Sequence, residues 1–176
     1  MKKLILLLLF IPLVSFGQIK LGSKVSYTKD KITFTIKKPE PFIESNTPFG
    51  ADEAKLVRSF YNAQNYQLIQ IHSNPIPKDF QNEANKLMQD SEMAKSLFER
   101  TLFPSPINKL LSYKKITINS IPFYEIELIT RNIEKQIAWI TVYKNSLVNI
   151  NSVTLTDNFN NIKGFLDNFK KHIELK

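Results

Sequence analysis

The chain has 176 residues, of which 43% are apolar and 11% aromatic, and it carries a formal net charge of +8. This length and composition predict one globular domain with a sizeable core. The sequence has no cysteine, which excludes disulfides, thiol nucleophiles and cysteine metal sites, and it has no repeat period of about 20–50 residues that would indicate a solenoid.

The N-terminus has the pattern of a secretory signal peptide. Two lysines precede an apolar run over residues 4–16, which is shorter than the roughly 20 residues that span a membrane. Small residues stand where a signal peptidase reads, so we expect cleavage between Gly17 and Gln18. No cysteine follows the run, so the chain is not expected to be a lipoprotein precursor. We therefore expect an exported protein, periplasmic or secreted, with residues 18–176 as a single α+β domain.

The first half of the mature chain alternates strands with loops. Residues 31–37 alternate between apolar and polar side chains, which predicts a half-buried strand ended by the prolines that follow. Residues 42–55 have no clear period and are predicted to be a loop. Residues 55–61 fit either a strand or a helical turn, and residues 66–72 predict another strand.

A long helix is predicted next, from residue 79 to a point before Pro104. Asp79 is expected to cap its start, and charged residues that include Asp90 would cover its outer face. The expected buried face consists of Phe80, Ala84, Leu87, Met88, Ala94 and Phe98.

Residues 114–156 predict a meander of four antiparallel strands, around which the domain is organised. A reversal near Ile133 would put apolar residues of two strands on one face: Tyr124, Ile126 and Leu128 beside Val142, Ile140 and Ala138. The opposite face would carry Glu125, Glu127, Trp139 and Thr141. Residues 119–120 and 144–146 are predicted turns, because asparagine tolerates the left-handed conformation.

The last segment changes to a helical period. One apolar stripe comprises Phe159, Ile162, Phe165, Leu166, Phe169 and Ile173. Asp157 or Asn158 is expected to cap the helix, and the positive residues 170–172 would lie in its last turn. We expect the stripe to pack on the sheet; a membrane-surface helix is the alternative.

Strands and helices do not alternate regularly, so the predicted class is α+β: an antiparallel meander packed by helices. Four stretches resemble the Mog1/PsbP-like α/β/α sandwich: the strand 32–36 with its following proline, the strand 67–72, the helix from Phe80, and the hairpin 116–123. The resemblance covers residues 25–176, although Ser120 stands where the family usually has glycine. It implies binding rather than catalysis, since members assist protein complexes, nuclear transport factors or secretion systems, and it assigns no site residue here.

Most catalytic chemistries lack the residues they need. His72 and His172 are a hundred positions apart, so a histidine metal site is not expected, and no cofactor is expected. The four glycines are never adjacent, which disfavours a phosphate-binding loop. Lysines are scattered rather than clustered with aromatics, which excludes nucleic acid and leaves weak contact with an anionic envelope surface.

The meander face with Trp139, Glu125, Glu127 and Thr141 is the candidate partner-binding site. If helices cover both faces of the sheet, Trp139 is core; if this face is open, an aromatic framed by polar groups fits a partner protein. A hydrolase that uses Asp52, Glu53, Glu125 or Glu127 is the alternative, although two carboxylates on one strand face are typical of pairing with lysine or threonine neighbours. A carrier with a phenylalanine-lined cavity is a third. The expected function is a non-catalytic binding or accessory module of the cell envelope with an envelope protein as partner.

Overall fold

The computed structural model describes residues 19–46, 54–102 and 108–176. The strands in these ranges are β1 Lys20–Lys29, β2 Ile32–Glu40, β3 Ile43–Ser45, β4 Leu56–Asn62, β5 Gln67–Pro75, β6 Asn108–Ile118, β7 Ile121–Thr130, β8 Glu134–Tyr143, β9 Ser146–Leu155 and β10 Glu174–Leu175. The helical segments are η1 Lys78–Phe80, α2 Gln81–Leu87, α3 Ser91–Leu102, η2 Thr156–Asn158, α4 Phe159–Phe169 and η3 Lys170–His172. Gly17, Gln18, Asp52 and Glu53 lie outside the described residues.

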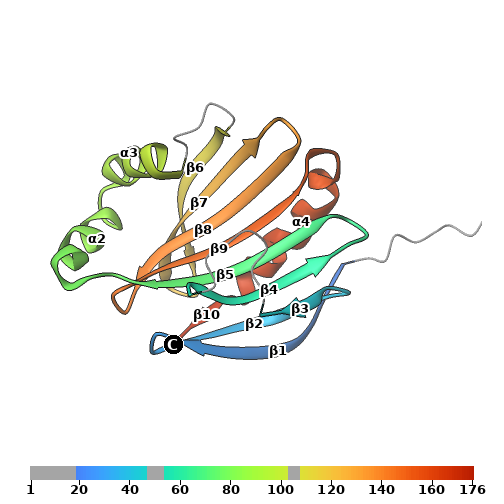
Figure 1. Ribbon diagram of the computed structural model, residues 1–176, viewed down its shortest axis with the longest axis horizontal. Helices are drawn as coiled ribbons and strands as arrows, with labels where there is room; N and C mark the ends of the chain where they lie inside the picture. Colours follow the sequence, from blue (N-terminus) through green and yellow to red (C-terminus); the bar gives the residue numbers. More distant parts are fainter. Residues whose placement is uncertain (1–18, 47–53, 103–107) are drawn as a thin grey trace, which may run out of the picture.

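The strands in the described ranges form two antiparallel sheets (Figure 1). The larger has seven strands in the order β3-β4-β5-β9-β8-β7-β6, and the smaller has three in the order β1-β2-β10. The predicted meander corresponds to β6, β7, β8 and β9, which are neighbours in sequence order. The undecided segment 55–61 is strand β4.

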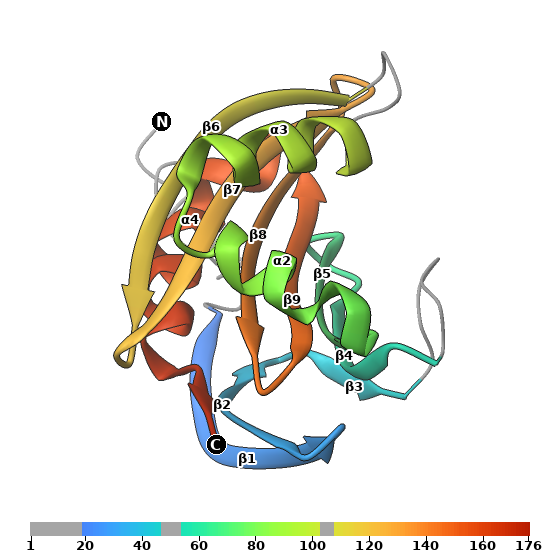
Figure 2. The same cartoon turned by 90° about the vertical axis from the view of Figure 1, so that its left-hand side faces the viewer.

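Helices pack on both faces of the larger sheet (Figure 2). The face that receives α2 and α3 is called here the α2–α3 face, and the opposite face, which receives α4 and the smaller sheet, is called the α4 face. A main core forms on the α4 face, where Phe34 of β2, Phe60 of β4 and Phe169 of α4 are buried together. A smaller core under α2 and α3 contains Tyr124 and Ile140. The predicted α+β class, with antiparallel strands packed by helices, is confirmed.

The two central hairpin strands have the predicted faces but a different register. Tyr124 pairs with Ile140 rather than with Val142, because the loop turns around Asn132 instead of Ile133. A change of one residue in the turn shifts the pairing by two, and a two-residue shift leaves each side chain on its original face. Glu125 consequently lies directly opposite Trp139.

The predicted long helix is wrong in its continuity. It is interrupted after α2, and Asp90, expected on the outer face, begins α3 instead. The Asp90 Oδ1 accepts hydrogen bonds of 3.0 Å from the backbone N–H groups of Glu92 and Met93, which is the N-cap arrangement. Asp79 lies inside η1 rather than at a cap position, since the N-cap residues of η1 and α2 are Pro77 and Phe80 and neither makes a side-chain capping hydrogen bond. Phe80 is 58% exposed rather than buried.

The C-terminal helix begins where the apolar stripe predicts, but it ends earlier. Four stripe residues are buried in α4: Phe159, Ile162, Leu166 and Phe169. After η3 the chain becomes strand β10, whose Leu175 pairs with Phe34 of β2. The predicted stripe residue Ile173 is buried after the helix rather than within it. No side chain in this part of the chain caps α4.

Candidate functional site

Glu125 lies at the centre of a charged cluster on the α4 face. Its Oε2 accepts hydrogen bonds from Trp139 Nε1 at 2.9 Å and from Lys170 Nζ at 2.8 Å. Its Oε1 forms an ion pair with Lys114 Nζ at 2.7 Å. Lys170 also binds Asp167 Oδ1 at 2.8 Å. Strands β6, β7 and β8 are thereby joined to the end of α4 through one carboxylate.

This environment keeps Glu125 ionised. Burial by itself would raise the pKa of this carboxyl, but hydrogen bonds from Lys114, Lys170 and Trp139 together outweigh it and lower the pKa to about 2. Burial also opposes the charge of Lys170, yet its bonds to Asp167 and Glu125 raise the pKa of this ammonium. A carboxylate held in this way is a poor proton donor or acceptor near neutral pH.

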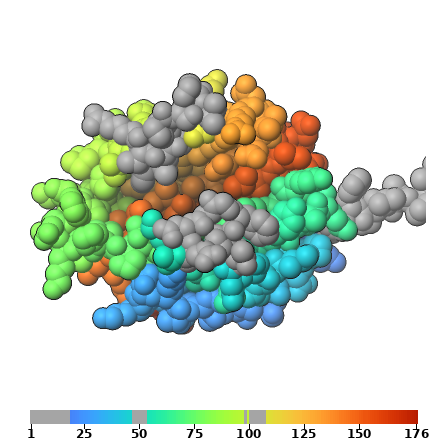
Figure 3. Space-filling view, in the orientation of Figure 1, coloured from blue at the N-terminus to red at the C-terminus, as the bar shows by residue number. Residues whose placement is uncertain are grey.

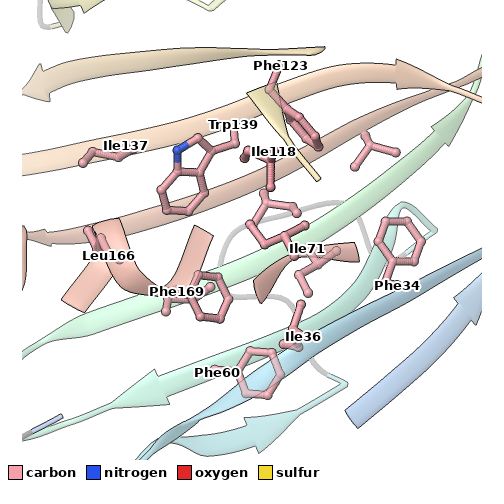
Figure 4. Close-up of a cluster of buried hydrophobic side chains, with 14 of the residues drawn as sticks. Phe34, Ile36, Phe60, Ile71, Ile118, Phe123, Ile137, Trp139, Leu166 and Phe169 are labelled. Carbon is pink, nitrogen blue, oxygen red and sulfur yellow. The ribbon is translucent and has the colours of Figure 1, made fainter. Parts of the chain in front are cut away.

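Trp139 is part of the core. It is 1% exposed, and its ring lies 6.3 Å from that of Phe169 of α4. Figure 4 shows its indole on the same side of the sheet as Leu166 and Phe169, the two labelled side chains of α4. The helix that follows the meander therefore covers this face.

The other two candidate residues on this face are also engaged. Glu127 forms an ion pair with Lys135 of β8 at 2.6 Å, and buried Thr141 donates a hydrogen bond of 2.7 Å to the carbonyl of Pro122. The structure thus brings all four predicted residues to one face, as the alternation indicates. The partner-site hypothesis required that face to be open, whereas α4 covers Trp139, which is the core arrangement that the sequence had left as the other possibility.

The two histidines lie in different parts of the fold. His72 is half-buried in β5, where burial and nearby Lys29 lower its pKa. His172 lies in η3, where burial and then Lys37 and Lys24 lower its pKa. Within residues 19–46, 54–102 and 108–176, no three His, Cys, Asp or Glu side chains gather to hold a metal ion. None of the helices described there is long and apolar enough to cross a membrane.

A groove between α2 and α3 was not predicted from the sequence. It has a volume of about 500 Å³ and is lined by Glu83, Lys86, Leu87, Met93, Ser96 and Leu97. Met93 is 47% exposed. Met93 and Leu97 lie outside the predicted buried stripe. Two large apolar residues on the expected polar face are the sequence feature that could have indicated this groove.

A second unpredicted feature lies on the α2–α3 face, across β5 and β9. Gln70 pairs directly with Asn151, and His72 pairs directly with Asn149. These four residues are called here the amide patch. Ala138 and Ile140 of β8 pair with Asn151 and Asn149, so the patch lies on the same face as these two core residues. Polar residues this close to a core usually have hydrogen-bond partners.

The comparisons with known proteins support the fold alone. No protein-family model matches the chain, and no curated protein matches it. Among solved structures, it is similar to the solution structure of cyanobacterial PsbP (CyanoP) from Synechocystis sp., with a TM-score of 0.55 and 14% sequence identity. The similarity covers 94% of this chain and 99% of that chain. The fold is PsbP-like.

The predicted family resemblance is thus confirmed at the level of fold. The similarity extends over almost the whole of both chains, so both sheets and the helices belong to one PsbP-like arrangement. At 14% identity, it transfers no site residue to this chain, and function has to be argued from the chain's own surfaces.

Proposed function

We propose that this protein is an exported, non-catalytic accessory module that binds an envelope protein through the groove between α2 and α3. The groove is the observation that carries the proposal, because it presents Leu87, Met93 and Leu97 at the surface. Apolar side chains that gather in one groove on a folded domain, rather than singly, commonly mark an interaction site.

Among the described side chains of the helix pair, Met88 and Ala94 are buried against the sheet and Leu87 packs partly against the same core. No residue of α2 is buried. On the other side of the pair, Met93 is 47% and Leu97 39% exposed, so apolar surface remains available to a partner. The proposed groove is therefore a feature of the helices rather than a gap in the core.

The rim of the groove indicates what it would bind. Glu83 and Lys86 are one turn apart on α2 and carry opposite charges beside the apolar lining. Protein interfaces commonly combine an apolar centre with a polar rim. The occupant we propose is a short apolar segment of an envelope protein, with a basic residue placed to meet Glu83 and an acidic residue placed to meet Lys86.

The experiment is an affinity capture of the tagged, exported chain from detergent-solubilised envelope, with Met93→Glu as the test variant. A charge at Met93 should remove the partner, because an unpaired carboxylate would be desolvated in the groove. Asn85→Glu is the matched control: it adds the same charge to exposed α2 but does not line the groove.

One envelope protein recovered in near-equal amount with the parent and with Asn85→Glu, and lost with Met93→Glu, supports the proposal. Recovery of the bait alone, or equal capture by both variants, overturns it. Sequencing the N-terminus of the same purified protein tests export, for which the first residue should be Gln18.

The hydrolase alternative has less support. An acid or base in a cleft needs a carboxyl group that can exchange a proton with substrate. Glu125 is bound by Lys114, Lys170 and Trp139, and Glu127 is bound by Lys135.

A weaker contact with an anionic envelope surface is also proposed, at the corner formed by β1, β2 and η3. Lys24, Lys37 and Lys171 all lower the pKa of His172 there, whereas Glu174 raises it. Glu174 forms an ion pair with Lys24 at 2.6 Å, so Lys37 and Lys171 would make the contact. Sedimentation with vesicles that contain anionic lipid, and release by salt, would support this contact. Equal sedimentation with neutral vesicles would contradict it.

A further inference from the structure

Strand β6 forms one edge of the larger sheet (Figure 2), and in the described part of the chain it pairs with β7 alone. It is 11 residues long, whereas β3 at the opposite edge has only three. A long edge strand presents unpaired backbone groups to which another extended chain can add. Peptides that bind in this way take their affinity from main-chain hydrogen bonds. The free side of β6 is therefore a candidate docking surface.

The hairpin with β7 determines which backbone groups of β6 face outward. Ile118 pairs with Ile121 across a two-residue turn, so this pair carries the first hydrogen bonds of the hairpin. Hydrogen-bonded and non-hydrogen-bonded pairs then alternate along the strand. Thr117 and Lys115 occupy non-hydrogen-bonded positions, and both residues are exposed. Their N–H and C=O groups consequently point away from β7, toward the free side of β6.

A hollow of about 310 Å³ adjoins the end of β6. Its lining consists of Ile116, Thr117, Ile118, Asn119, Lys170 and Lys171. Ile118 belongs to the main core and Ile116 packs against it, so the hollow lies on the α4 face. Asn119 Nδ2 donates hydrogen bonds to the carbonyls of Lys171 and Ile173, at 3.3 and 2.7 Å, which holds η3 beside the strand. A chain added to β6 here would place one side chain over the hollow.

The surroundings of the hollow are basic. Strand β6 contains three lysines and no acidic residue. Lys114 and Lys170 are bound to Glu125, whereas Lys171 is exposed and forms no ion pair among the described residues. A carboxylate over the hollow would meet the ammonium of Lys171. Charge complementarity therefore favours an acidic peptide as the occupant.

A second copy of this chain fits the edge less well. Two β6 strands paired edge to edge would bring the lysines of both copies together, and like charges on neighbouring strands are destabilising. A bulge between Leu110 and Ser112 also interrupts the strand. Lysines and bulges on an edge strand are common protections against self-pairing, and the same lysines would attract an acidic chain.

We propose that β6 binds an extended acidic peptide segment, which adds to the sheet as a further strand and places a carboxylate in the hollow beside Lys171. Peptide residues opposite Lys115 and Thr117 would exchange backbone hydrogen bonds with them. The residue between these two, opposite Ile116, would carry the carboxylate, because directly opposite side chains lie on the same face of a sheet.

This surface is separate from the groove between α2 and α3. In the space-filling view (Figure 3), the green surface of these two helices forms the left-hand side of the molecule. They pack on the α2–α3 face, whereas the hollow lies on the α4 face. The proposal for β6 therefore does not depend on the groove.

The test uses the purified chain and the blocked peptide N-acetyl-Ser-Thr-Val-Glu-Val-Thr-Ser-amide, titrated while the backbone amide signals are followed by NMR. The signals of Lys115 and Thr117 should shift, and their hydrogen exchange should slow, because both N–H groups gain an acceptor. Replacement of the peptide's glutamate by glutamine should weaken binding about two- to fivefold, the effect of one exposed ion pair.

Two N-methylated peptides form a matched pair that leaves the protein unchanged. Methylation of both valine nitrogens removes the N–H groups that would face β6, so it should weaken binding about tenfold or more, the effect of losing two hydrogen bonds. The glutamate N–H would point away from β6, because N–H groups alternate in direction along a strand. Methylation of that nitrogen should leave binding unchanged.

A variant of the protein tests the place of the carboxylate. Lys171→Gln should weaken binding of the glutamate peptide about two- to fivefold and leave binding of the glutamine peptide unchanged. Lys163→Gln is the control, because Lys163 is an exposed lysine of α4 that does not line the hollow. It should bind both peptides as the parent does.

Slower exchange at Lys115 and Thr117, with binding lost on valine methylation alone, supports the proposal. Equal binding by both methylated peptides overturns it and leaves only attraction between the lysines and the carboxylate. An absence of shifts at millimolar peptide, or equal effects of Lys171→Gln and Lys163→Gln, also overturns it. A chain that is dimeric before peptide is added, with these two amides already protected, overturns the peptide in favour of a second copy.

Discussion

Trp139 Nε1 donates a hydrogen bond of 2.9 Å to Glu125 Oε2, and the two residues are direct cross-strand partners on β8 and β7. Glu125 as a whole is 8% exposed. It remains charged there because Lys114 and Lys170 also bind it, so the buried indole and the two lysines act on one group. Two properties of the protein follow from this relationship.

The first prediction concerns acid stability. The pKa of Glu125 falls from 4.5 to about 2 on folding. A lowered folded-state pKa contributes stability that is present above pH 4.5 and is lost as the pH falls toward 2. This contribution is on the order of 3 kcal/mol. Glu125→Gln should therefore lower the free energy of unfolding at pH 7 by about 2–3 kcal/mol. Urea denaturation should also show that the free energy of unfolding falls less steeply between pH 4.5 and 2 in this variant than in the parent.

Glu127→Gln is the control for this experiment, because Glu127 lies on the same strand face and forms its ion pair with Lys135 alone among the described residues. Its side chain is more exposed than that of Glu125, so the loss should be about 0–1 kcal/mol. Equal losses in the two variants, or an unchanged acid transition in Glu125→Gln, would contradict the role assigned to Glu125.

The second prediction concerns Trp139 as a core residue. Trp139→Ala should lower the free energy of unfolding by about 3–5 kcal/mol, while Trp139→Phe, which keeps an aromatic ring and loses the donor to Glu125, should cost about 1–3 kcal/mol. The chain has one tryptophan, so native fluorescence should be blue-shifted and protected from acrylamide. An unchanged melting temperature in Trp139→Ala would instead assign Trp139 to an accessible surface.

The sheet face on which each meander side chain lies could be predicted from the sequence. Whether a helix packs over that face could not. Alternation at Tyr124, Glu125 and Ile126 fixes which side chains share a face, and a register change of two residues preserves that property. Whether the face of Trp139 meets solvent depends on where α4 docks, which is a long-range contact that no local pattern specifies.

The helix break was hidden by the same periodicity that predicted the helix. Met88 and Ala94 are both buried, yet they belong to opposite sides of the interruption, because an apolar stripe continues across a short break between adjacent helices. Aspartate is favoured both at an N-cap and on the solvent-facing side of a helix. The sequence of this segment therefore does not distinguish the two positions for Asp90. The groove exists only because α2 and α3 are separate.

The amide patch is also a tertiary feature. Gln70 and Asn151 are about eighty positions apart in the sequence and become neighbours only when β5 pairs with β9. Each lies in a strand whose other residues alternate normally, so neither stands out in the sequence.

The third prediction tests the start of α3. Asp90→Ala removes the acceptor for the N–H groups of Glu92 and Met93 and should lower the free energy of unfolding by about 1 kcal/mol. Asp90→Asn should retain most of this stability, because the asparagine side-chain oxygen can also accept from these N–H groups. Asp79→Ala is the control and should change stability by less than about 0.5 kcal/mol. Hydrogen exchange at Glu92 and Met93 should accelerate in Asp90→Ala; equal effects at Asp79 and Asp90 would restore the single-helix prediction.

The fourth prediction uses the turn between β6 and β7. Ile118 pairs with Ile121, so Asn119 and Ser120 form a two-residue turn, and both have positive φ, 47° and 69°. Asn-Gly is the preferred pair for this kind of turn, because glycine adopts positive φ without a steric cost. Ser120→Gly should therefore raise the free energy of unfolding by about 0.5–1 kcal/mol, measured by chemical denaturation.

Ser112→Gly provides the comparison for the turn variant. Ser112 is an exposed residue within strand β6, where glycine gains nothing from positive φ and loses more backbone entropy on folding, so the variant should lose about 0.5–1 kcal/mol. Opposite signs at positions 120 and 112 would show that the left-handed backbone of Ser120 is the cause. If both variants lose stability, the Ser120 side chain contributes more to the free energy of unfolding than its positive φ costs.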